Sequence, residues 1–98
     1  MVRKIKKRDG RIVNFNPEKI YNAIQKCTED TGVQVNLKNL TEYIVSIINH
    51  KYNGKRPTVE DIQDTVENAL MERNHHELAK SYILYRQERT FEREKILA

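Results

Sequence analysis

The sequence predicts a single α+β domain, mainly helical, in which a small N-terminal β-hairpin packs against a cluster of four helices. A chain of 98 residues has room for one hydrophobic core, so the domain spans residues 1–98. Residues 1–15 hold an Asp-Gly turn signal between short segments of mixed basic and apolar residues. The remainder carries apolar residues at helical spacing in segments separated by glycine, proline or asparagine.

The hairpin register follows from the side chains around Asp9-Gly10. A two-residue turn would place Ile5 opposite Asn14, whereas a three-residue turn with a left-handed glycine places Ile5 opposite Val13. A slip of one residue moves every side chain to the other face, so the apolar Ile5–Val13 pair favours the three-residue turn. One face of the hairpin is then predicted to carry a row of side chains that ends in a lysine at the turn: Phe15, Val13, Ile5 and Lys7.

The first two helices are delimited by asparagine caps. Residues 17–30 are predicted to form the first helix, with Asn16 as the N-cap before a proline and with a glycine just beyond its end. The second helix begins after Asn36 or Asn39, either of which fits as the N-cap, and ends at about Asn53. Their predicted buried residues recur at helical spacing: Ile20, Ala23, Ile24, Cys27, Leu40, Ile44, Ile47, Ile48 and Tyr52.

The third and fourth helices follow a short loop. Thr58 is predicted to cap the third helix, with Asp61 three residues later as in a capping box. The fourth runs from about His76 to beyond Thr90. Their apolar residues are Val59, Ile62, Val66, Ala69, Leu70, Leu78, Ala79, Tyr82, Ile83 and Tyr85. Positive charge gathers in the C-terminal half of the fourth helix, where the helix dipole favours it: Arg86, Arg89, Arg93 and Lys95. Arg93 and Lys95 are predicted to be solvated.

Composition excludes several classes of protein. With 33% charged and 38% hydrophobic residues, the chain has a globular composition, and its apolar runs are too short to span a membrane. The single cysteine, Cys27, cannot form an internal disulfide and lies on an apolar helical stripe, where it is predicted to be core. The adjacent histidines of the turn, His75 and His76, are predicted to be exposed and not metal ligands. No signal peptide is visible, so the cytoplasm is the expected location.

Basic residues crowd the N-terminal hairpin against a single acid, Asp9: Arg3, Lys4, Lys6, Lys7, Arg8 and Arg11. Such a cluster can bind phosphate, nucleic acid or anionic lipid, or it can protect an edge strand from aggregation. Both interpretations stay open for Arg3, Lys4 and Lys6. The predicted register brings Lys7 toward Lys19 and toward the free N–H groups that begin the first helix, an arrangement that suits a polyphosphate.

Three stretches of the chain resemble the ATP-cone, the regulatory nucleotide-binding domain at the N-terminus of many ribonucleotide reductases: VRKIKKRDGRIVNFNPEKI (2–20), PTVEDIQDTVENAL (57–70) and AKSYILYRQER (79–89). Together they cover nearly the whole chain. The resemblance implies that a nucleotide lies between hairpin and helices, with ATP as activator and dATP as inhibitor, commonly with Mg²⁺. It also implies that the domain controls a reductase catalytic domain or subunit through changes in association, homo-oligomers included.

The resemblance also implies which residues bind the nucleotide. From the hairpin and the first helix, Ile5 and Ile20 would pack against the adenine. Lys7 and Arg8 would contact the phosphates, and Asn16 and Lys19 would complete that side of the pocket. The later helices would line the rest of the pocket, through Thr58, Ile62, Gln63, Tyr85 and Arg89.

Catalytic motifs are absent from the sequence. It contains no glycine-rich phosphate loop, no Walker lysine and no recognisable catalytic set, so the domain is predicted to bind a nucleotide without turning it over. Two alternatives belong to other classes: a nucleic-acid-binding module or an oligomerisation module of a transcriptional regulator. Nucleic acid is disfavoured because aromatic residues do not interleave with the basic ones in the hairpin. An excised reductase domain is preferred over a free-standing regulator.

Overall fold

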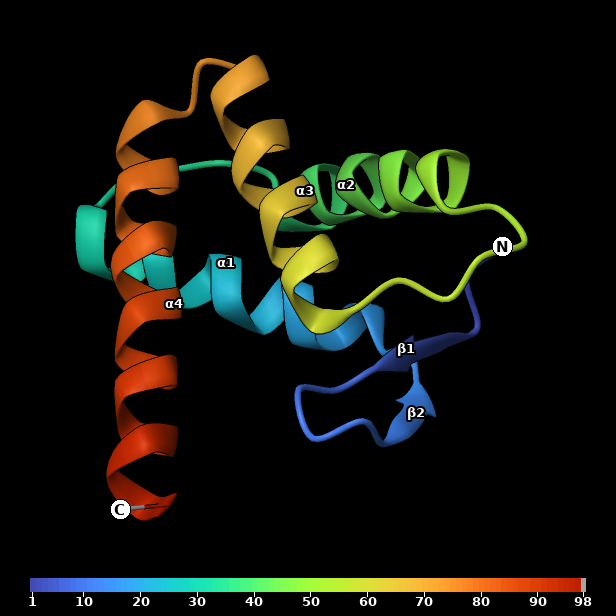
Figure 1. Ribbon diagram of the computed structural model, residues 1–98. Coiled ribbons are helices and arrows are strands. Elements are labelled where there is room, and N and C mark those ends of the chain that lie inside the picture. Colours follow the sequence, from blue (N-terminus) through green and yellow to red (C-terminus); the bar gives the residue numbers. More distant parts are fainter. Residues whose placement is uncertain (98) are drawn as a thin grey trace.

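The computed structural model describes residues 1–97, with side chains described for residues 1–90 and for Glu92. A two-stranded antiparallel sheet precedes four helices (Figure 1): β1 (Lys4–Lys6), β2 (Ile12–Asn14), α1 (Pro17–Thr31), α2 (Leu37–Lys51), α3 (Val59–Glu72) and α4 (His76–Leu97). The predicted fold, a small hairpin on a cluster of four helices, is confirmed. Arg93 and Lys95, predicted to be solvated, lie outside the described side chains.

The hairpin adopts the predicted register. Ile5 pairs with Val13, and the N–H of Lys7 donates to the carbonyl of Arg11 at 2.8 Å across the three-residue turn. Gly10 has φ 89°, a left-handed conformation that a side chain would strain. The backbone N–H and the guanidinium of Arg11 both donate to the Asp9 carboxylate, and these bonds lower the pKa of Asp9.

The segment that precedes α3 attaches the hairpin to the helices. The N–H of Lys6 donates to the carbonyl of Pro57 at 2.9 Å, and Lys6 forms an isolated parallel bridge with Thr58. Figure 1 shows β1 lying beside the segment that enters α3. Val2 provides a second attachment that the sequence did not suggest: its side chain is buried, and its N–H donates to Asn49 Oδ1 at 2.9 Å. The hairpin is therefore held to α2 by the residue Val2, which precedes β1, and to the segment before α3 by β1 itself.

Side-chain caps set the helix boundaries. Asn16 Oδ1 accepts from the N–H of Glu18, and Asn36 does the same for Asn39, which decides between the two predicted caps of α2. Two ends differ from the sequence prediction. Helix α1 continues one residue further, to Thr31, before the left-handed Gly32 closes it. Helix α2 stops at Lys51 instead of about Asn53, because the next residue already departs from helical backbone angles.

The hydrophobic core lies among the helices. Helix α4 packs against α1 and α3, and α2 packs against the same two helices (Figure 1). The fully buried side chains come from each helix and include Ile24, Ile44, Ile48, Val66, Leu70 and Leu78. Cys27 is buried, as predicted, and burial raises the pKa of its thiol. Ile47 and Tyr52, predicted to be buried, are only partly so. Within residues 1–97, no helix is both long enough and apolar enough to cross a membrane.

Candidate functional site

A cavity of about 180 Å³ lies between the hairpin and helices α1, α3 and α4. It is lined by the row of hairpin side chains that the register predicts and by residues of all three helices: Ile5, Lys7, Val13, Asn14, Phe15, Asn16, Lys19, Ile20, Ala23, Val59, Ile62, Gln63, Tyr82, Tyr85 and Arg89. Every residue predicted for the nucleotide site is in this set except Arg8 and Thr58. The structure therefore brings most of the predicted set around one cavity; that they bind a nucleotide stays a prediction.

Most of the cavity wall is apolar. Ile20, Ile62 and Tyr82 belong to the buried core and present one side of their side chains to the cavity. Tyr85 lies beside Tyr82, with ring centroids 6.1 Å apart and ring planes inclined by 32°. Burial raises the pKa of Tyr82, so its hydroxyl stays neutral at physiological pH. Such a wall of branched aliphatic and aromatic side chains suits a flat, largely apolar ring system.

Positive charge enters the lining from three separate elements. Lys7 comes from the turn end of the hairpin, Lys19 from the first turn of α1 and Arg89 from α4. The guanidinium carbon of Arg89 also lies 6.0 Å from the ring centroid of Tyr85. Among the residues whose side chains the structure describes, no aspartate or glutamate lines the cavity. A group that combines a flat ring with negative charge would therefore find complementary partners on this lining.

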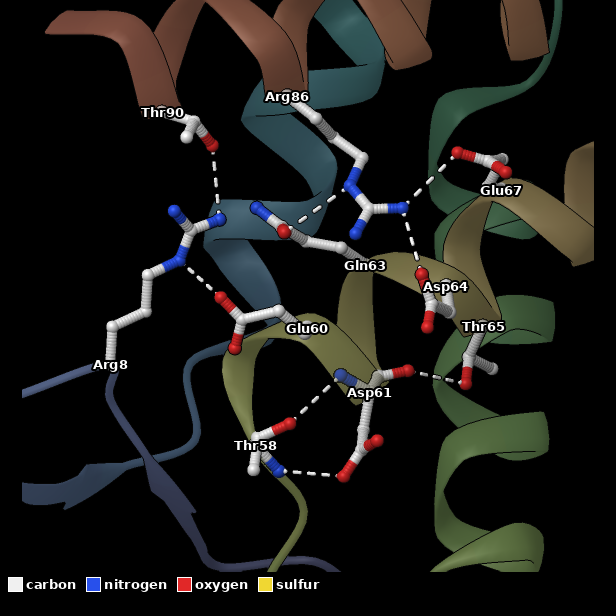
Figure 2. Close-up of polar contacts among 10 residues, drawn as sticks. All are labelled: Arg8, Thr58, Glu60, Asp61, Gln63, Asp64, Thr65, Glu67, Arg86 and Thr90. Carbon is white, nitrogen blue, oxygen red and sulfur yellow. Dashed lines mark hydrogen bonds and ion pairs between the residues drawn. The ribbon is translucent and has the colours of Figure 1, made fainter. Parts of the chain in front are cut away.

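Arg8 and Thr58 are engaged elsewhere. The guanidinium of Arg8 pairs with the carboxylate of Glu60 on α3 and donates to Thr90 Oγ1 on α4 at 3.0 Å (Figure 2). Thr58 caps α3: its Oγ1 accepts from the N–H of Asp61 at 3.1 Å, and its own N–H donates to the Asp61 carboxylate at 3.0 Å. The capping box is confirmed. In this structure Arg8 links the hairpin turn to two helices, and Thr58 faces its own helix end.

Arg86 forms a polar cluster next to the cavity that sequence reasoning left unassigned. Its Nε donates to Gln63 Oε1 at 3.2 Å, and its Nη1 contacts the carboxylates of Asp64 at 2.9 Å and Glu67 at 3.1 Å (Figure 2). Burial alone would lower the pKa of Arg86, but the two carboxylates outweigh it and raise the pKa. A signal was present in the sequence, since Asp64 and Glu67 share one face of α3 at a spacing of three residues.

Six lining residues were not named for the site in the sequence analysis: Val13, Asn14, Phe15, Ala23, Val59 and Tyr82. The signal for Val13 and Phe15 was already in the predicted hairpin face, which carries them beside Ile5. Tyr82 precedes Tyr85 by three residues on α4, the spacing at which two side chains share a helix face. Asn14 gave no signal, because a strand residue on the outer face is expected to point away from the helices.

A second concave region lies between α1 and α4 and has a volume of about 400 Å³. It carries charges of both signs, including Lys26, Asp30 and Glu77, and is not bordered by the hairpin. The smaller cavity is the better candidate because its charged lining residues, among those described, are all positive and the rest of its wall is mostly apolar. Among the described residues there is no group of three or more histidine, cysteine, aspartate or glutamate side chains placed to hold a metal ion.

Comparison with known proteins gives a consistent result. Residues 3–96 match the ATP cone domain family. The chain is 37% identical over 102 residues to the vitamin B12-dependent ribonucleoside-diphosphate reductase of Thermoplasma acidophilum, covering 97% of the chain and 13% of that protein. It is 33% identical over 92 residues to the anaerobic ribonucleoside-triphosphate reductase of Escherichia coli, covering 93% and 13%. It is 37% identical over 94 residues to a ribonucleoside-diphosphate reductase alpha subunit of Chlamydia trachomatis, covering 85% and 9%. The chain thus spans only about a tenth of the length of these relatives.

Proposed function

This chain belongs to the ATP-cone family, and from that premise we propose that the cavity between its hairpin and helices binds ATP and dATP. The domain then acts as an allosteric regulatory unit of a ribonucleotide reductase, in partnership with the catalytic domain or subunit. The cytoplasm is the expected compartment, where a lone thiol such as that of Cys27 stays reduced.

The observation that carries the proposal is the composition of one cavity lining. Lys7, Lys19 and Arg89 converge from three elements on a cavity whose remaining wall is apolar and aromatic. The apolar part offers contacts to a base, and the cations offer charge-assisted bonds to phosphate oxygens. The first turn of α1, which contains Lys19, adds the positive end of a helix dipole.

The size of the cavity assigns the two parts of the ligand to different places. A volume of about 180 Å³ is below the roughly 300–1,000 Å³ typical of pockets that enclose a small molecule. We therefore expect the adenine to enter between Ile5, Ile20 and Ile62, while the phosphates lie at the open side near Lys7. Mg²⁺ would arrive bound to the phosphates, since no carboxylate lines the cavity within the described part of the chain.

Regulation would work through association. ATP and dATP differ only in the ribose 2′-hydroxyl, and one hydrogen bond to that group is worth about 0.5–1.5 kcal/mol. A ligand shifts an equilibrium between two states only by the difference in its affinity for them. We therefore expect the small preference at each site to be multiplied when several copies of the domain assemble. The lining formed by the described side chains contains no carboxylate that could act as a base toward a water at the phosphates. We therefore expect the nucleotide to be bound and released unchanged.

Calorimetry with ATP, dATP and GTP tests the binding step. We expect saturable binding of both adenine nucleotides with a dissociation constant in the micromolar range, about −8 kcal/mol, and weaker binding of GTP. Equal and weak heats for all three nucleotides would contradict the proposal. Light scattering of the domain on its parent reductase chain tests the regulatory step: identical assembly states in saturating ATP and dATP, or release of ADP by the domain, would contradict it.

A further inference from the structure

Gln63 lines the cavity and is at the same time bound by Arg86. We propose that Arg86 is a positioning residue for the nucleotide site, and that it fixes the Gln63 side chain so that the amide presents hydrogen-bond donors to the ligand. This inference rests on the proposed function of the cavity. Arg86 itself is not part of the cavity lining, so its effect on the ligand has to pass through Gln63.

The chemistry of the two side chains fixes the orientation of the amide. A guanidinium only donates hydrogen bonds, so the amide atom at 3.2 Å from Arg86 Nε must be the carbonyl oxygen of Gln63. The amide nitrogen then points away from Arg86, as Figure 2 shows. A free glutamine can present either atom by rotating about its last bond, but rotation here would set the NH₂ group against the N–H of Arg86.

Arg86 can hold this orientation because it is itself fixed. Its Nη1 is shared between Asp64 at 2.9 Å and Glu67 at 3.1 Å, both on α3 within one turn of Gln63. The side chains of Arg86 and Glu67 are 19% and 24% exposed, so water competes less for their contact than for the one with Asp64, whose side chain is 60% exposed. The planar guanidinium spaces its N–H groups rigidly, so the two carboxylates that contact Nη1 restrict where the Nε–H points. Asp64 and Glu67 thus position Arg86, and Arg86 in turn orients the Gln63 amide.

A fixed donor restricts what can bind next to Gln63. The NH₂ group can pair with an acceptor on an adenine nucleotide, either an unprotonated ring nitrogen or a ribose oxygen. A ligand group that only donates would leave the amide unpaired in a partly buried place, which is costly. Arg86 would therefore raise the affinity for ligands with an acceptor at this position without touching them.

A double-mutant cycle on the whole chain measures the coupling. We expect Arg86→Met to weaken ATP binding about three- to tenfold when Gln63 is present, but less than about twofold in the Gln63→Ala background. Loss of the Arg86 charge leaves two carboxylates uncompensated, and that long-range effect would persist in both backgrounds. Equal losses in the two backgrounds would therefore overturn the proposal. Lys80→Met is the matched control, because it removes one positive charge from an exposed position of the same helix that does not line the cavity.

The free protein offers a readout that does not need the nucleotide. In the ¹⁵N–¹H spectrum, the side-chain NH₂ signals of Gln63 are those missing from Gln63→Ala. We expect them to shift in Arg86→Met and to stay in place in Lys80→Met; unmoved signals in Arg86→Met would overturn the proposal. If Arg86→Met does not fold, Arg86→Lys serves instead, since an ammonium keeps the charge but cannot bond Gln63, Asp64 and Glu67 in the same fixed geometry.

Measuring the double-mutant cycle with both ATP and dATP also identifies the ligand atom that accepts the hydrogen bond from Gln63. A coupling seen with ATP and lost with dATP assigns the 2′-oxygen, whereas equal couplings assign another ribose oxygen or the base. Absence of any nucleotide binding by the wild-type chain would remove the proposed function and the role of Arg86 with it. In that case the NMR shift would still show whether Arg86 orients Gln63, so the two failures are distinguishable.

Discussion

The two walls of the cavity differ in how they are held. The helical wall consists of side chains such as Ile20, Ile62 and Tyr82, which are less than 10% exposed and belong to the core. The hairpin wall consists of two strands of three residues each, whose side chains are half-buried at most. A two-stranded hairpin of this length has little stability of its own. It is ordered by the Val2 attachment, the Lys6–Pro57 bond and the Arg8 contacts.

The difference indicates a division of roles. Segments with little buried apolar surface open at lower free energy than the core, so the hairpin wall is the part that a ligand can shift. The helical wall keeps its shape and provides the surface for the base. Lys7 lies on the hairpin wall, and Lys19 and Arg89 lie on the helical wall. A polyphosphate that binds all three would connect the two walls, which gives the ligand a means of changing the outer surface of the domain.

The largest effect is expected in the core that supports the fixed wall. Leu78→Ala on α4 removes a side chain that is 0% exposed and should lower the free energy of unfolding by about 2–5 kcal/mol. Leu84→Ala is the control on the same helix, because its side chain is 57% exposed; a change within about 0.5 kcal/mol is expected. Urea denaturation measures both. Similar losses for the two variants would mean that α4 packs differently from this description.

On the hairpin wall, affinity and stability should separate. Lys7→Ala removes a charge-assisted phosphate contact of about 1.5–3 kcal/mol, so ATP affinity should fall at least about tenfold. The melting temperature without ligand should barely change, because Lys7 lies next to an exposed turn. Lys6→Ala is the control: its side chain is exposed and does not line the cavity, and its backbone bond to Pro57 is retained. Unchanged affinity in Lys7→Ala would place the phosphate site elsewhere.

What the sequence predicted well was set locally. The Ile5–Val13 register follows from side-chain alternation and turn length, and the helix starts follow from caps two or three residues away. The register also brings Lys7 to the same cavity as Lys19, and both inferences need only neighbouring residues. The third cation of the lining, Arg89, was named for the site from the resemblance to the ATP-cone family and not from local spacing.

What the sequence did not predict depends on pairing between distant elements. The contact of Val2 with Asn49 joins residues far apart in the chain, and a single valine before a basic segment gives no sign of it. The contacts of Arg8 with Glu60 and Thr90 were likewise not predicted, and its expected contact with the phosphates stays a prediction. The choice among partners of a long, flexible arginine depends on which helix ends lie near it, and that is known only once the helices are packed.

Replacing two N-cap residues should distinguish a residue that contacts the ligand from one that only stabilises its helix. Thr58→Ala and Asn16→Ala each remove a cap and should each lower the free energy of unfolding by about 1 kcal/mol. Only Asn16 lines the cavity, so only Asn16→Ala should also weaken ATP binding. Denaturation and calorimetry on the same samples give both numbers. A loss of affinity in Thr58→Ala as large as in Asn16→Ala would return Thr58 to the set of direct ligands.

The smallest effect concerns the Arg8–Glu60 pair, which joins the hairpin to α3. Its side chains are 32% and 41% exposed, so the ion pair itself contributes little, and Glu60→Gln should change the free energy of unfolding by less than about 1 kcal/mol. The substitution removes the negative charge that pairs with Arg8, the neighbour of Lys7, and so frees the guanidinium from its carboxylate partner while the bond to Thr90 remains. ATP affinity should therefore rise by about two- to fivefold, and the gain should shrink at high salt, where exposed charges are screened.

The double variant Arg8→Met with Glu60→Gln separates the two contributions to that gain. If the released arginine binds phosphate, most of the gain is lost when Arg8 is also replaced; if only the repulsion matters, the gain remains. Glu72→Gln, at the far end of α3, controls for the change in net charge. A fall in ATP affinity in Glu60→Gln would contradict the expectation and would mean that the pair holds the hairpin in place over the ligand. In that case the hairpin would have to be in contact with α3 before the nucleotide can bind, because the Arg8–Glu60 pair would then be part of the binding-competent state.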